Sequence, residues 1–106
     1  MRKTRALVQV ALAFLDEPRQ RHWGYELGKK ASVTSGVLYP LLSRLLDAGW
    51  VTDGWEDPAA IQGRPPRRYY LLTEEGIRQL GGIVASAHGE PRFNGLSWLR
   101  RPLGSS

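Results

Sequence analysis

The sequence contains no cysteine, and this absence removes three kinds of chemistry. Without cysteine there is no disulfide, no thiolate metal site and no cysteine nucleophile. The two histidines, His22 and His88, are isolated from each other, and the Gly-x-Ser-x-Gly motif is also missing. Isolated histidines give no basis for acid–base or triad chemistry. We therefore expect a protein that is not an enzyme and that uses neither a cofactor nor a metal.

Long hydrophobic runs are also missing. A membrane-spanning helix needs about 20 apolar residues, and no run approaches that length. The apolar segment 6–15 is interrupted by Gln9 and followed by Asp16 and Glu17. Basic residues at positions 2, 3 and 5 precede this segment. A basic and then apolar order is typical of a secretory signal, but no small-residue cleavage site follows. We expect a cytoplasmic protein with no membrane partner and with segment 6–15 as a helix that is buried or bound to a partner.

Acidic residues are fewer than basic ones, and the two kinds are unevenly distributed. The chain has 15 Lys and Arg against 10 Asp and Glu, a net charge of +5. By segment the net charge is +4 in 1–30, −3 in 31–57, +3 in 58–72 and +1 in 73–106. A basic balance suits a polyanionic partner, most often nucleic acid. Any contact with phosphates should come from the segments that flank residues 31–57.

The stretch from Val33 to Gly49 has the pattern of an amphipathic helix with defined ends. Thr34 can cap its N-terminus through the hydroxyl, and Gly49 suits a left-handed C-terminal residue. The apolar side holds Val37, Leu38, Leu41, Leu45 and Ala48, and the other side holds Gly36, Tyr39, Pro40, Ser43, Arg44 and Asp47. The second side carries small residues instead of the usual Glu and Lys. Such a face can approach another surface closely.

The segments around this helix predict a chain that is mainly α-helical with a small β-hairpin. Residues 23–31 predict a short helix, and the Ser32–Val33 link to the next one is the outline of a helix-turn-helix. Residues 50–56 and 67–72 are rich in β-formers, including Trp55, Tyr69 and Tyr70, which we expect in the core of the sheet. Between these strands, 57–66 ends in two prolines that limit its flexibility. The three arginines of segment 58–72 should therefore lie on a semi-rigid arm.

The last predicted helix begins after Thr73, a suitable N-cap, and ends near Gly89. Its apolar residues recur every three or four positions, which predicts a stripe that needs a partner. The tail 91–106 contains Trp98 and is expected to be partly disordered. The tail should dock on the body of the chain or on a second subunit.

Five motifs in this order carry a resemblance to a known family. They are Trp-Gly-Tyr-Glu-Leu from Trp23, Gly-Val-Leu-Tyr-Pro-Leu-Leu-Ser-Arg-Leu from Gly36, Ala-Gly-Trp-Val from Ala48, Gly-Arg-Pro-Pro-Arg-Arg-Tyr-Tyr from Gly63 and Leu-Thr-Glu-Glu-Gly from Leu72. The chain resembles the PadR family of bacterial transcriptional regulators over roughly residues 7–80, in a compact branch with a short C-terminal region. The family usually has His at the position of Trp23.

The resemblance implies a winged helix-turn-helix that acts as a homodimer and usually represses transcription. It implies a DNA-binding domain at 1–72, a dimerisation helix at 73–90 and a tail at 91–106. Helix 35–48 would be the recognition helix, and residues 64–68 would lie in the wing. The first and last helices would form the dimer through Leu7, Leu12, Ile77, Leu80, Val84 and Ala87.

DNA binding needs phosphate contacts for position and base contacts for discrimination. The candidate DNA-binding residues are Tyr25, Lys29, Ser35, Gly36, Tyr39, Ser43, Arg44, Arg64, Arg67 and Arg68. Arg44 can pair with guanine or phosphate, and Arg64 can enter a narrow minor groove. Three structural alternatives stay open: Tyr39 packs beneath the wing, Arg44 is only solvated, and Lys29 only complements its helix dipole.

The sequence thus predicts a sequence-specific DNA-binding regulator, a repressor that acts as a homodimer on a near-palindromic operator in double-stranded DNA. One alternative is a winged-helix module that binds a partner protein with the same face. Another is a ligand-gated repressor in which Trp98 lines a pocket for a small aromatic compound.

Overall fold

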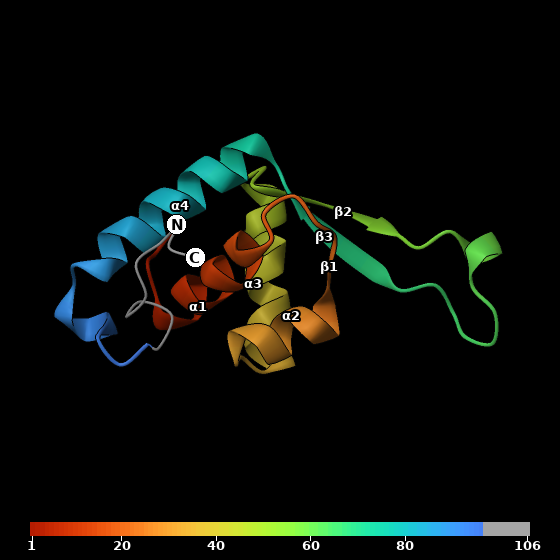
Figure 1. Cartoon of the computed structure of the whole chain (residues 1–106), viewed down its shortest axis with the longest axis horizontal. Coiled ribbons are helices and arrows are strands. Elements are labelled where there is room, and N and C mark those ends of the chain that lie inside the picture. Colours follow the sequence, from red (N-terminus) through yellow and green to blue (C-terminus); the bar gives the residue numbers. More distant parts are fainter. Residues whose placement is uncertain (97–106) are drawn as a thin grey trace.

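Four α-helices and a three-stranded antiparallel sheet form the described part of the chain. The computed structural model describes residues 1–96 (Figure 1). The elements, in order, are α1 (Arg5–Asp16), β1 (His22–Trp23), α2 (Gly24–Ala31), α3 (Ser35–Asp47), β2 (Val51–Trp55), η1 (Pro58–Ala60), β3 (Arg68–Leu72), α4 (Glu74–His88) and η2 (Pro91–Phe93). This architecture confirms the predicted fold class, a mainly helical winged helix-turn-helix with a small β element. In the described residues no helix is long and apolar enough to cross a membrane.

The sheet has the order β1-β3-β2, so one strand was not predicted. His22 and Trp23 of β1 pair with Tyr70 and Tyr69 of β3. Trp23 was expected to open the second helix, but it is an extended residue that precedes it. A two-residue strand carries no periodicity of its own. Only the neighbouring strand β3 provides the pairing that makes it one.

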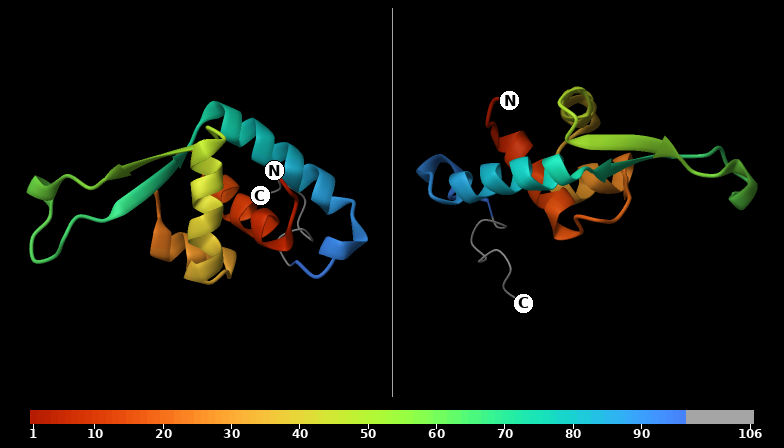
Figure 2. Two further views of the ribbon diagram at one scale, coloured as in Figure 1. Left: turned by 180° about the vertical axis from the view of Figure 1, so that it is seen from behind. Right: turned by 90° about the horizontal axis from the view of Figure 1, so that it is seen from above.

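Helix α1 is the centre of the hydrophobic core, which decides between the two sequence interpretations of segment 6–15. Leu7, Val8, Val10, Ala11 and Phe14 have no exposed surface. Helices α2, α3 and α4 pack around α1, while the β2–β3 hairpin projects beyond the helices (Figures 1 and 2). The segment is thus buried within its own chain.

The buried face of α3 differs at its margins from the predicted face. Leu38, Leu41 and Leu45 are buried as expected, and Leu42 joins them at 1% exposed. Val37 and Ala48 were assigned to the same side but are exposed. Each residue turns a helix by about 100°, so Val37 lies one full step from Leu38 and outside the buried arc.

Trp55 also departs from the sequence prediction. Tyr70 is 2% exposed and lies in the core, and Tyr69 is half-buried, but Trp55 is 65% exposed. Trp55 is the last residue of β2, a strand of the hairpin that projects beyond the helices (Figure 1). Because no helix covers this part of the sheet, its side chain stays in solvent.

The stripe of α4 lies in the core of the single chain. Five of the six residues expected at a dimer interface, Leu7, Leu12, Leu80, Val84 and Ala87, are at most 4% exposed. They belong to one cluster in which α4 packs on α1. Only Ile77 of the six is partly exposed. Contact with a second subunit through α4 would therefore need its other faces.

The first residues of the expected tail also join this core. Phe93, which ends the short helix η2, is 2% exposed, and Leu96 is 4% exposed. Both belong to the cluster formed by α1 and α4. These first residues of the segment 91–106 therefore pack on the body of the chain. Trp98 lies outside the described residues.

Candidate nucleic-acid interface

A tight turn joins α2 to α3. Ser32 ends α2 in the left-handed conformation with φ 58°, and the Val33 N–H donates to the Gly28 carbonyl over 3.0 Å. Thr34 is the N-cap residue of α3 as predicted, but its hydroxyl makes no capping hydrogen bond. Gly49, after the end of α3, has the predicted positive φ, 76°. The turn thus holds the two helices at a defined angle.

Two glycines let α3 lie directly on α2. A Cβ atom on Gly24 would come within 2.5 Å of the Tyr39 hydroxyl oxygen, and one on Gly28 within 3.3 Å of Leu38 Cδ2. The Tyr39 ring therefore lies across the start of α2, although 45% of the residue is exposed. One side of Tyr39 packs on α2, and the other side faces solvent.

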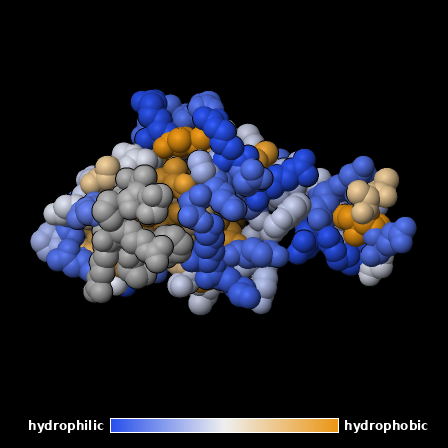
Figure 3. All heavy atoms as spheres, viewed as in Figure 1, coloured by the Kyte–Doolittle hydropathy of each residue, from blue (hydrophilic) through white to orange (hydrophobic). Residues whose placement is uncertain are grey.

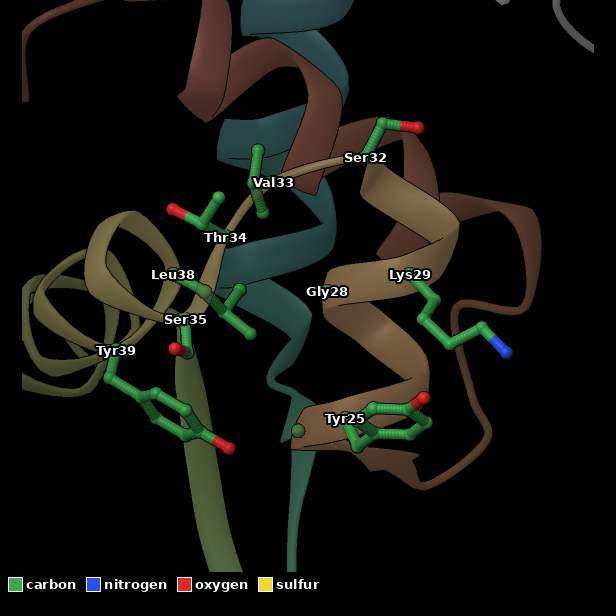
Figure 4. A pocket seen from close by; sticks show the side chains of 10 residues that line it. Tyr25, Gly28, Lys29, Ser32, Val33, Thr34, Ser35, Leu38 and Tyr39 are labelled. Atoms are coloured by element: carbon green, nitrogen blue, oxygen red, sulfur yellow. The ribbon is translucent and has the colours of Figure 1, made fainter.

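The outward face of α3 presents the predicted small and polar residues. Ser35, Gly36, Ser43 and Arg44 are all exposed. A groove of about 480 Å³ separates the start of this helix from α2. Tyr25 of α2 and Tyr39 of α3 lie on either side of its opening (Figure 4). This surface is open enough for another molecule to approach the helix backbone.

Cations on this side of the molecule differ in their partners. Within residues 1–96, Lys29 and Arg44 form no ion pair. Lys29 lies over the ring of Tyr25, with Nζ 5.4 Å from its centroid, and Tyr25 itself is 71% exposed. Their positive charges are therefore available to a polyanion.

The wing arginine Arg64 is held by Glu56. Its two terminal nitrogens donate to the two carboxylate oxygens of Glu56 over 2.6 and 3.0 Å. The Arg67 backbone N–H donates to Glu56 Oε1 over 2.8 Å. These hydrogen bonds lower the pKa of Glu56 to about 2. The pairing closes the base of the loop that joins β2 to β3 and orients Arg64.

Arg67 and Arg68 also have acidic partners. Arg67 lies over the ring of Trp23 and reaches Glu26 of α2 over 3.3 Å. Arg68 donates through Nε to Asp53 Oδ2 over 2.7 Å. Segment 58–72 itself has no acidic residue. The fold brings carboxylates of β2 and α2 to its arginines.

The wing meets the helix-turn-helix at one place. A cavity of about 260 Å³ is lined by Glu26 of α2, Tyr39 of α3 and both Arg67 and Arg68 of the wing. Nine of the ten candidate DNA-binding residues lie on α2, α3, β3 or the residue before β3, and Arg64 lies in the loop between β2 and β3. The structure thus joins helix and wing in one continuous region.

Two residues of this region were missed by sequence reasoning. Arg21 lies beside the wing, with its guanidinium carbon 4.4 Å from the centroid of the Tyr69 ring. Exposed Trp55 lies opposite Arg68 across the β2–β3 pair. Arg21 lies in a polar connection that has no helix or strand periodicity. Trp55 is an aromatic residue at the end of a strand, a pattern that predicts a place in the core of the sheet. Only the paired strands place both residues near the wing arginines.

Helices α2 and α3, joined by a tight turn, with a hairpin wing beside them, define a winged helix-turn-helix protein. Residues 12–82 match the sequence model described as the transcriptional regulator PadR-like family. The chain belongs to this family of transcriptional regulators, which confirms the resemblance seen in the sequence. Its members bind DNA, so the chain is a DNA-binding regulator.

Solved structures agree with this assignment. A PadR-like transcription factor from Bacteroides fragilis is 27% identical, with a TM-score of 0.56 over 76% of this chain and 81% of that one. A PadR-like transcriptional regulator from Bacillus cereus is 24% identical, with a TM-score of 0.58 over 76% and 80%. The circadian clock associated protein Pex from Anabaena is 21% identical, with a TM-score of 0.61 over 81% and 76%. No curated protein sequence matches the chain.

Proposed function

We propose that this regulator is a repressor that binds a near-palindromic operator as a homodimer. The observation that carries the proposal is the continuity of the exposed α3 face with the arginine-bearing wing. Helix α3 would enter the major groove through its small-residue face, with Arg44 contacting a base edge or a phosphate. The wing would lie on the flanking backbone or minor groove. Residues 1–72 would form the DNA-binding part.

The homodimer follows from the family, in which dimerisation is typical. Two-fold symmetry would place the two α3 helices one DNA turn apart, about 34 Å, on a palindromic site. Because its buried stripe contacts α1, α4 would meet a partner through other residues, such as the partly exposed Ile77 and Ile83. Repression would result from occupation of a promoter by this dimer.

The test is a binding titration with DNA from upstream of the chain's own gene and with random DNA of equal length, across a salt series. We expect tighter binding to the upstream DNA, a steep loss of affinity with salt, and two chains per bound site by sedimentation. Equal binding to both DNAs would contradict a sequence-specific repressor. Absence of binding to either at low salt would reject DNA binding itself.

Arg44→Ala tests the proposed reading helix in the same assay. Arg44 is exposed and has no ion pair with the described residues, so its loss should leave folding unchanged. We expect a loss of affinity for the specific site of about 5- to 150-fold, because a base contact of Arg typically contributes about 1–3 kcal/mol. Arg78→Ala, which changes an exposed arginine on α4, is the matched control and should bind like the parent.

A further inference from the structure

The acidic partners of the wing arginines come from outside the wing segment 58–72. Glu56 pairs with Arg64 and contacts Arg67, Asp53 pairs with Arg68, and Glu26 pairs with Arg67. Two of these carboxylates belong to segment 31–57, whose net charge is −3. The net charge of +3 in segment 58–72 is therefore balanced by three carboxylates at the base of the wing. Electrostatically, the wing of the free protein is close to neutral.

Glu56 is the most enclosed of these carboxylates. Its side chain is 14% exposed, against 34% for Asp53 and 52% for Glu26. It accepts hydrogen bonds from both terminal nitrogens of Arg64 and from the backbone of Arg67. A phosphate binds a guanidinium through the same two-pronged geometry that a carboxylate uses. Glu56 therefore occupies the edge of Arg64 that would contact DNA.

Two cations of the helix-turn-helix differ from the wing arginines in their partners. Lys29 of α2 and Arg44 of α3 have no acidic partner among the described residues. A random DNA duplex could attract these two charges as well as the operator could. The wing, by contrast, must exchange a carboxylate for each phosphate it contacts. That exchange becomes favourable when α3 docks in its site and holds the wing against the backbone.

We propose that Glu56, together with Asp53, is an internal competitor for the wing arginines, which DNA phosphates must displace before the wing can bind. The proposal rests on the DNA-binding function proposed above. The acidic groups lower the affinity of the wing for every DNA backbone, because each phosphate contact has to displace a carboxylate from its arginine. Glu56 acts through Arg64 and Arg67 and does not itself contact the DNA bases.

The test replaces Glu56 by Gln, which keeps the shape of the side chain and its ability to accept the Arg67 N–H. We expect Glu56→Gln to bind random DNA about five- to tenfold more tightly at low salt, with a salt slope steeper by about one, the change that one additional phosphate contact causes. Binding to the upstream site should tighten by at least the same factor, because the wing contacts phosphates there and no longer has to displace the Glu56 carboxylate. The ratio of specific to random affinity should therefore stay the same or rise.

Glu75→Gln is the matched control. Glu75 pairs with Arg78 on α4, so this variant has the same change in net charge at a distance from the wing. It should bind both DNAs like the parent. A Glu56→Gln protein that behaves like Glu75→Gln would overturn the proposal, since net charge alone would then explain any change. Weaker binding to both DNAs by a folded Glu56→Gln protein would also overturn it.

Asp53→Asn is a second test of the proposal, for the case in which Glu56→Gln lowers the melting temperature of the protein. Asp53 pairs with Arg68 on the strand and takes no part in closing the wing loop. Asp53→Asn should also tighten binding to random DNA, and unchanged binding would overturn the proposal. A parent chain that binds no DNA would instead reject the proposed function. If the parent discriminates between the two DNAs and the variants bind both DNAs as the parent does, only this inference is rejected.

Discussion

His22 shows how burial changes the chemistry of a single residue. It is 6% exposed, and its ring lies against Phe14 with their centroids 4.9 Å apart. Its Nε2 lies 2.8 Å from the Glu17 carbonyl oxygen, so Nε2 carries the hydrogen and donates it. Burial, the largest cause, lowers the pKa of His22 below its usual 6.5. Burial therefore favours the neutral form of this histidine in the folded protein.

The pKa of His22 predicts how stability depends on pH. Above pH 6.5 the ring is neutral in both folded and unfolded chains, so it adds no pH dependence. As the pH falls below 6.5 the unfolded chain takes up a proton that the folded chain does not, and the free energy of unfolding should decrease, by at most about 1.4 kcal/mol per pH unit. Urea unfolding between pH 7.5 and 5 measures the effect. His22→Gln should lose most of it, and the same decline in that variant would exclude His22 as its origin.

At the scale of elements, the start of α4 depends on one glycine. The Thr73 hydroxyl accepts from the Gly76 N–H over 2.9 Å and donates to the Gly49 carbonyl over 2.8 Å. These bonds fasten α4 to the end of α3. A Cβ on Gly76 would lie 1.8 Å from the Trp50 carbonyl oxygen. The close approach of these two backbones thus requires a residue without a side chain.

Two glycine substitutions in α4 should have opposite effects. Gly76→Ala should destabilise the protein by about 2–3 kcal/mol, because backbone must move to admit the methyl group. Gly82→Ala, in the same helix with nothing within 4 Å of the new atom, should stabilise it by about 0.5–1 kcal/mol. Denaturant unfolding of the two variants beside the parent measures both changes. A Gly76→Ala protein as stable as Gly82→Ala would show that the two backbones do not meet this closely.

Elements whose signals are local were predicted well. Hairpin strands expected at 50–56 and 67–72 are observed at Val51–Trp55 and Arg68–Leu72, and Thr73 caps α4 through its hydroxyl as predicted. The short strand β1 was missed because its two residues pair only with the distant β3. Capping and periodicity depend on residues within about one helical turn or strand, whereas strand pairing depends on the rest of the fold.

At the scale of the whole molecule, the segment before α1 and the segment after α4 lie together. Lys3 Nζ donates to Glu90 Oε1 over 2.6 Å and to Ser86 Oγ over 2.7 Å. Phe93 and Leu96 fill the core beside α1 and α4. Residues at both ends of the described chain therefore enclose the same core that positions the helix-turn-helix.

Phe93→Ala tests whether this C-terminal segment contributes to the global fold. Loss of a buried Phe side chain should lower the free energy of unfolding by about 3–5 kcal/mol. Exposed Asn94→Ala, the neighbouring control, should change it by less than about 0.5 kcal/mol. Thermal or urea unfolding measures both. If Phe93→Ala unfolds like Asn94→Ala, the segment does not pack on the core in solution.

The sequence by itself determined the class of protein, because its helix periods, caps and family motifs are properties of neighbouring residues. It also determined which residues of α3 face outward, apart from those at the margins of the buried arc. Only the tertiary structure decided that Trp55 is exposed, that the stripe of α4 meets α1, and that carboxylates hold the wing arginines. Glu56 and Arg64 are eight positions apart and Glu26 and Arg67 are forty-one apart. Such pairs form only when remote elements pack, so no local pattern records them.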